Sequence, residues 1–282
     1  LLFRTFLLRP YVFAFLAMFL FCSIRLLGWR RTGLFLAFTW ATAFICEFSS
    51  TRTGIPFGWY YYTASTVGQE LYLSNIPFMD SLSFTFLLYA SYCLALLFLL
   101  PARAGNRLVS GVWGRPGWPE LIFDQDVRTS WPVLSLTVLF FAFIDVIIDP
   151  VALRGDRWFL GQIYGYQDQG VYYGVPLANF LGWAVVALIA LAGYFVLDRR
   201  LSPPARHAAG NQHETVMTIN VLLGCGLYYC VLIFNLGVTF WIGEPQLGMT
   251  GILIYLPITV LFILRLLSRL PAHSPQQPER SL

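Results

Sequence analysis

Long apolar stretches recur along this sequence, and they decide what the chain can fold into. A helix needs about 20 apolar residues to cross the ~30 Å hydrocarbon core of a bilayer. Hydropathy predicts seven such spans, at residues 10–28, 33–49, 81–100, 131–148, 177–197, 215–241 and 251–267. With 57% hydrophobic and only 11% charged residues, the chain lacks the polar surface of a soluble enzyme. We therefore expect an all-α, polytopic transmembrane helix bundle.

The bundle is expected to be one unit. Residues 1–268 are predicted to form a single integral membrane domain, and residues 269–282 a polar, disordered tail. The first span follows Arg4 and Arg9 but has no small-x-small cleavage site before Arg25, which favours a retained helix over a signal peptide. All 18 basic residues are arginine, so Schiff-base chemistry, including that of a retinal-binding receptor, is excluded.

The arginines are unevenly shared between the two ends of the predicted spans. Thirteen of the 18 fall on one face, namely Arg25, Arg30, Arg31, Arg103, Arg107, Arg115, Arg128, Arg199, Arg200, Arg206, Arg265, Arg269 and Arg280. The positive-inside rule assigns that face to the cytoplasm. The N-terminus and connections 50–80, 150–176 and 242–250 then face outward. We expect an integral protein of a bacterial-type cell (inner) membrane.

Two of the outward connections are rich in Tyr, Trp, Phe and Gly, a composition typical of the membrane interface. We expect both to be interfacial or re-entrant segments that fold back into the bundle. Each follows an acidic residue and precedes a proline at a helix start. Glu47 lies 30 residues before Pro77, and Asp145 lies 31 residues before Pro176. This order indicates a weak parallel internal repeat.

Carboxylates inside predicted spans or at their ends are the strongest functional candidates, because a carboxylate in a span costs ~2.5 to 3.5 kcal/mol to insert. Four lie in the outward half of the bilayer: Glu47, Asp80, Asp145 and Asp149. Asp145 and Asp149 are four residues apart, so they share one helix face, and two like charges there favour one shared proton.

Structural explanations compete with the catalytic one. Glu47 would also be satisfied as a buried acid beside tyrosine hydroxyls or Arg52, and Asp149 followed by Pro150 would also serve only to end a helix. A neutral buried carboxyl group among aromatic rings nevertheless has the properties needed to protonate an alkene, because ring faces stabilise the resulting carbocation.

Metal and nucleic-acid sites have little support. The Asp-x-x-x-Asp pair resembles half of a Mg²⁺ site for a prenyl diphosphate, with Arg154 and Arg157 as diphosphate ligands. The second Asp-rich cluster of such a site is missing, since Asp124 and Asp126 lie on the opposite face. The five cysteines lie in apolar runs and the three histidines have no ligand spacing, so no metal site is predicted. A scattered net charge of +4 does not indicate nucleic acid.

Several motifs in residues 40–190 occur in a recognisable order. These are Glu47, Thr53-Gly54-Ile55-Pro56-Phe57-Gly58, Tyr60-x-Tyr62, Asp145-x-x-x-Asp149-Pro150, Trp158 and Gly174-Val175-Pro176-x-x-Asn179-Phe180-x-Gly182-Trp183. The chain resembles the membrane carotenoid-biosynthesis family that includes carotenoid 1,2-hydratases and bisanhydrobacterioruberin hydratase. We expect the substrate to be bound by Pro56, Phe57, Tyr60, Tyr62, Trp158, Tyr172, Asn179 and Trp183.

The resemblance implies addition of water across the terminal C1=C2 double bond of an acyclic carotenoid, within membrane lipid. No cofactor is then expected, and neither a Gly-rich dinucleotide fingerprint nor a His-rich iron site is present in the sequence. Glu47 or Asp149 is expected to act as the acid, while the other carboxylates, Asn179 or a tyrosine orient water.

Three alternatives remain at this stage. A carotenoid end-group cyclase shares the acid and the carbocation with a hydratase. A Mg²⁺-dependent membrane prenyltransferase would use the aspartate pair. A pigment or lipid transporter would be non-catalytic, but its carboxylates are expected to form a path across the bilayer rather than a cluster in one half.

Overall fold

The computed structural model describes residues 1–102, 119–201 and 214–269, and the predicted tail lies outside them apart from residue 269. Seven of its helices are long and apolar enough to cross a membrane, which confirms the predicted transmembrane bundle. They are α2 (Pro10–Leu27), α3 (Trp29–Thr53), α4 (Phe78–Leu99), α6 (Trp131–Ala152), α7 (Leu177–Leu201), α8 (Thr218–Trp241) and α9 (Pro245–Arg269).

Local sequence explains where the helices begin and end. Pro10 opens α2, where its missing N–H and fixed φ cost nothing. Gly54 closes α3 in the left-handed conformation at φ 74°, which only glycine adopts readily. The alternative in which Asp149 and Pro150 end a helix is wrong: α6 continues past Pro150 to Ala152, and the Leu153 amide still donates to the Asp149 carbonyl at 2.9 Å. Asp149 therefore lies inside a helix and does not end it.

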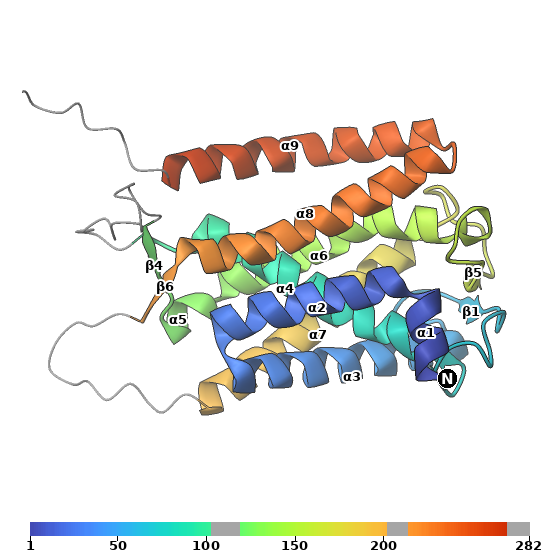
Figure 1. Ribbon diagram of the computed structural model, residues 1–282, viewed down its shortest axis with the longest axis horizontal. Coiled ribbons are helices and arrows are strands. Elements are labelled where there is room, and N and C mark those ends of the chain that lie inside the picture. Colours follow the sequence, from blue (N-terminus) through green and yellow to red (C-terminus); the bar gives the residue numbers. More distant parts are fainter. Residues whose placement is uncertain (103–118, 202–213, 270–282) are drawn as a thin grey trace, which may run out of the picture.

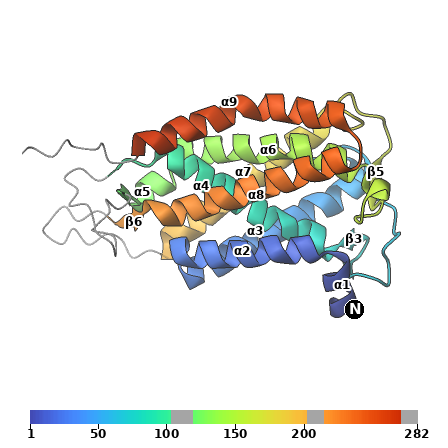
Figure 2. The ribbon, with the colours of Figure 1, turned by 45° about the horizontal axis from the view of Figure 1, so that its top comes forward.

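α4 is the central helix of the bundle (Figure 1). α3 packs against α4 and α7, and α6 packs against α4 and α7, so two helix pairs lie together. Most side chains of α4 are buried, and α2 and α8 cover it from outside. α9 lies at the edge of the bundle in both views (Figures 1 and 2) and exposes large apolar side chains, as expected of a lipid-facing helix.

The two Tyr/Gly segments meet at the end of the bundle that carries the N-terminus (Figure 1). β1 (Tyr60–Tyr62) and β5 (Tyr164–Tyr166) form an antiparallel pair in which Tyr60 faces Tyr166 and Tyr62 faces Tyr164. At the same end lie α1 (Leu2–Leu8), β2 (Tyr72–Leu73), β3 (Ile76–Pro77) and the 3₁₀ turn Gly155–Arg157. The segments thus form a short two-stranded ribbon that covers the helix ends.

The opposite end carries a buried charge cluster. Arg128 of α5 (Gln125–Arg128) donates to Asp198 at 3.1 Å and to Glu214 at 2.8 Å, and Arg31 reaches Asp198 at 2.8 Å. The strands β4 (Glu120–Ile122) and β6 (Thr215–Met217) pair beside it. Of the thirteen arginines assigned to this face, Arg103, Arg107, Arg115, Arg206 and Arg280 lie outside the described residues.

We propose that this arginine-rich end faces the cytoplasm, and cysteine labelling tests it. A cysteine at Val171, 82% exposed beside β5, should react with an impermeant thiol reagent on intact cells. A cysteine at Arg200, exposed at the other end of α7, should react only after the cells are permeabilised. Cys230 is the exposed native cysteine among the described residues and is replaced by serine in both. The reverse pattern would invert the topology.

Candidate active site

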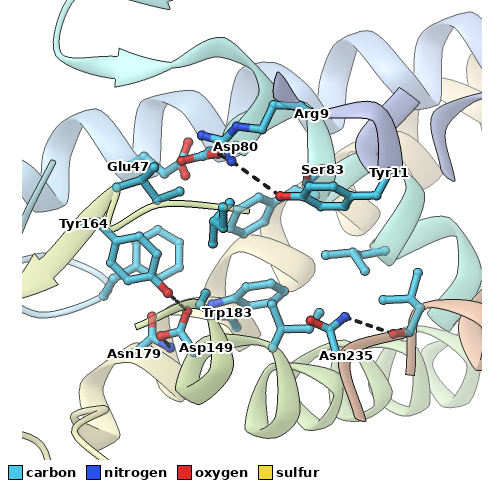
Figure 3. Close-up of a pocket in the computed structure, with 18 of the residues that line it drawn as sticks. Arg9, Tyr11, Glu47, Asp80, Ser83, Asp149, Tyr164, Asn179, Trp183 and Asn235 are labelled. Atoms are coloured by element: carbon cyan, nitrogen blue, oxygen red, sulfur yellow. Dashed lines mark hydrogen bonds and ion pairs between the residues drawn. The ribbon is translucent and has the colours of Figure 1, made fainter. Parts of the chain in front are cut away.

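A cavity of about 150 Å³ lies beneath the tyrosine ribbon. Side chains from α2, α3, α4, α6, α7 and α8 line it, together with β1, β5 and the turn after α6. Figure 3 shows Glu47 and Asp80 on one side of this space, with Asp149 and Asn179 on the other. The polar side chains that flank the first Tyr/Gly segment and those that flank the second therefore line the same cavity.

Glu47 stands near the C-terminal end of α3 and is 4% exposed. Its Oε1 accepts a hydrogen bond from the Tyr62 hydroxyl at 3.0 Å, and its Oε2 accepts one from Ser81 in the first turn of α4. The Tyr60 hydroxyl donates to the backbone carbonyl of Glu47 at 3.3 Å. Each carboxyl oxygen thus has one hydroxyl partner, and a hydroxyl either donates or accepts.

Asp149 lies on α6 and accepts three hydrogen bonds. Tyr164 donates to Oδ1 at 2.5 Å, while Tyr166 at 2.5 Å and the Asn179 amide at 2.8 Å donate to Oδ2. Asn179 also donates to Oδ2 of Asp145 at 2.6 Å, so both hydrogens of its amide are used. Asp145 is completely buried behind the cavity wall, and among the described residues its Oδ1 has no hydrogen-bond partner.

The two halves of the site use the same spacings. The tyrosine that donates to the carboxylate follows it by 15 residues in both halves, as Tyr62 follows Glu47 and Tyr164 follows Asp149. A second donor lies in the first turn of the next helix, 34 residues after a carboxylate in both halves. Ser81 follows Glu47, and Asn179 follows Asp145, by this spacing. Glu47 accepts both contacts in the first half. In the second half Asp149 accepts from the tyrosine, and Asn179 is shared between Asp145 and Asp149.

Aromatic rings form the apolar wall. Trp183 stacks on Phe84 with ring centroids 4.7 Å apart and lies 4.8 Å from Phe141, while Phe57 meets Phe84 edge-on at 6.0 Å. Gly182 permits this packing, because a Cβ there would lie 2.9 Å from the Phe57 Cα and would overlap its ring. Aromatic rings attract a positive charge that forms against their faces.

Arg9 is a buried cation at the edge of the cavity, and sequence reasoning did not identify it. Its guanidinium contacts Glu70 at 2.7 Å and Asp80 at 3.4 Å, and it donates to the Tyr11 hydroxyl at 3.5 Å. Burial alone would lower the pKa of Arg9, but Asp80, Tyr11 and Glu70 together raise it above its ordinary value. Asp80 is thereby held in an ion pair at the cavity wall.

The ribbon tyrosines remain neutral phenols. Burial, followed by the nearby Glu47 carboxyl, raises the pKa of Tyr62 well above its ordinary value. Burial and Asp149 do the same for the pKa of Tyr164 and of Tyr166. Each of these hydroxyls therefore keeps its proton at neutral pH.

Most predicted site residues reach the cavity wall. Those that line it are Glu47, Phe57, Tyr60, Tyr62, Asp80, Asp149, Trp158, Asn179 and Trp183. Pro56 and Tyr172 do not line it. The Pro56 carbonyl lies against α7 beside Gly182, and the Tyr172 ring packs on Tyr173 and Phe180.

Other lining residues were not selected from the sequence. They include Arg9, Tyr11, Tyr164, Tyr166, Phe234 and Asn235. For Tyr164 and Tyr166 a signal existed: they stand two residues apart around Gly165, the spacing that puts both side chains on one face of a strand. The α8 residues carry no such pattern.

Comparison with known proteins shows which sequences this chain is similar to. A family model described as "Carotenoid biosynthesis protein" matches residues 8–256. The bisanhydrobacterioruberin hydratase of Haloarcula japonica is 29% identical over 171 residues, which cover 60% of this chain and 47% of that protein. The chain therefore spans about half the length of this curated relative. No solved structure matches it.

Proposed function

Because the chain belongs to the carotenoid biosynthesis protein family, we propose that it adds water across the terminal C1=C2 double bond of an acyclic carotenoid. The observation that carries this proposal is the pair of tyrosine-bound carboxyl groups, Glu47 and Asp149, at one aromatic-lined cavity. A cavity of about 150 Å³ is the size that holds benzene in an engineered protein. It suits one isoprenoid end, while the rest of the polyene extends into the lipid of a bacterial-type inner membrane.

Glu47 is the general acid in this proposal. Both of its partners, Tyr62 and Ser81, are hydroxyls, so the carboxyl group keeps them when it carries a proton. It gives that proton to C2 of the carotenoid, and the positive charge settles on tertiary C1. The faces of Trp183, Phe84 and Phe57 stabilise this cation.

Asp149 is the general base. The Asn179 amide nitrogen can only donate, and with Tyr164 and Tyr166 it holds the oxygens of Asp149 as acceptors. A water molecule hydrogen-bonded to Asp149 attacks C1, its oxygen forms the new C–O bond, and its proton passes to Asp149. The product is a tertiary alcohol, and no electrons are exchanged.

Asp145 and Asp80 are positioning residues. Asp145 fixes the Asn179 amide from behind the cavity, at 2.6 Å. Asp80 is paired with Arg9, and this ion pair favours its ionised form, which has no proton to give. Trp158 and Tyr60 shape the wall for the carotenoid chain.

Expression of the full chain in a host that accumulates an acyclic carotenoid tests the function. Pigments extracted after growth in heavy-oxygen water should gain the mass of one labelled water per reacted end. Oxygen that comes from labelled oxygen gas would contradict hydration and indicate oxidation. A ring-containing product of unchanged mass would identify a cyclase, and loss of activity on magnesium chelation would identify a prenyltransferase.

A further inference from the structure

Hydration by two carboxyl groups leaves the site unable to react again. After one turnover Glu47 has lost a proton and Asp149 has gained one. Both residues are buried, with exposed fractions of 4% and 6%. Building on the proposed function, we infer that Tyr62 and Tyr164 carry the proton back from Asp149 to Glu47. The tyrosine ribbon would then be the device that resets the enzyme after each turnover.

The position of the two tyrosines supports this role. They are direct partners in the β1–β5 pair, with ring centroids 6.4 Å apart. The Tyr62 hydroxyl contacts Glu47 at 3.0 Å, and the Tyr164 hydroxyl contacts Asp149 at 2.5 Å. Each end of this tyrosine pair therefore contacts one of the two groups that must exchange a proton.

The chemistry balances with one bridging water, which is not consumed, and no other reagent. Asp149 gives its proton to the Tyr164 oxygen while the phenolic proton of Tyr164 moves on through one bridging water to Tyr62. Tyr62 in turn passes its own proton to Glu47. Both tyrosines end neutral, as the raised pKa of each requires, one proton has moved, and rotation of the hydroxyls restores the starting state.

A rival route enters from the aqueous face through Asp80, whose side chain is 16% exposed and lies at the cavity wall. Bulk protons would then recharge Glu47, and Tyr164 would have no part in the reset. The two routes differ in whether Tyr62 and Tyr164 act as one path.

The experiment compares Tyr62→Phe, Tyr164→Phe and the double variant, as purified full-length protein in lipid vesicles loaded with the acyclic carotenoid. The first turnover uses a Glu47 that is already protonated, so it should keep most of its rate. Steady-state turnover should fall about 10²-fold, the lower end for a positioned proton-transfer group. Because both changes cut the same path, the double variant should be no slower than the slower single variant.

Several outcomes would overturn the inference. Effects that multiply to about 10⁴-fold in the double variant would mean that each tyrosine only holds its own carboxylate. Equal slowing of the first turnover and the steady state would mean the same. Tyr61→Phe is the matched control, because Tyr61 is on β1 but 47% exposed and outside the cavity, and it should leave both rates unchanged.

A measurement on the unmodified protein guards against variants that misfold. The steady-state turnover rate, measured in mixtures of normal and heavy water, should vary non-linearly with the deuterium fraction, because several protons move in the reset. A straight line would indicate one moving proton and would contradict the relay. Absence of hydration by the unmodified protein would instead count against the proposed function.

Discussion

Glu47→Gln is expected to reduce carotenoid hydration by about 10² to 10⁴-fold, the usual contribution of a general acid. Glutamine has the size of glutamate and still hydrogen-bonds to Tyr62 and Ser81, but it has no carboxyl proton to give to C2. The fold should therefore survive while the product disappears. Pigment analysis of cells that express the variant, normalised to the amount of protein in the membrane, measures the loss.

Asp168→Asn is the matched control for this prediction. Asp168 is exposed in the loop after β5, on the same side of the bundle, and it does not line the cavity. The same acid-to-amide change there should leave hydration unchanged. If Glu47→Gln retained the activity of the control, Glu47 would not be the acid, and the assignment would pass to the aspartates of α6.

The span prediction succeeded because burial in lipid imposes a length and a composition that each helix shows by itself. The tyrosine ribbon is different. Its strands are three residues long, and Tyr62 and Tyr164 are about a hundred residues apart, so no local pattern predicts that they pair. The repeated order of acid, Tyr/Gly segment and proline indicated that the halves are alike, but not how they meet.

Arg9 shows a second limit of sequence reading. Before a first span, an arginine is normally counted as a flanking charge. Its partners, Glu70 and Asp80, come from a connection and a helix more than sixty residues away, and only the folded chain brings them together. The interpretation of Asp149 and Pro150 as a helix end failed for a related reason, since hydrogen bonds on either side of Pro150 continue α6.

Asp149→Asn should separate protonation from water attack. Hydration should fall about 10² to 10⁴-fold, because the asparagine cannot accept the proton of the attacking water. Glu47 is intact in this variant, so it still protonates the alkene, and the cation reverts to alkene by losing a proton from C2 back to Glu47. In heavy water the recovered substrate should therefore carry deuterium although little alcohol forms. Mass analysis of the unreacted carotenoid measures this exchange.

The substitution also perturbs the site, since the new amide would face the donors Tyr164, Tyr166 and Asn179. A buried donor that loses its partner costs about 1–3 kcal/mol, so a lower thermal stability is expected. Deuterium in the recovered substrate would prove that the cavity still binds and protonates the alkene despite that cost. Glu47→Gln should show neither alcohol nor deuterium, because it cannot form the cation at all.

The opposite pattern, exchange in Glu47→Gln and none in Asp149→Asn, would reverse the two roles, with Asp149 giving the proton and Glu47 receiving it. Exchange together with a ring-containing product would have a different meaning. Without water held by Asp149, the cation at C1 is open to attack by a double bond of its own chain. The same cavity would then direct cyclisation, and the carboxylate that binds water would be the feature that selects the proposed hydration over ring closure.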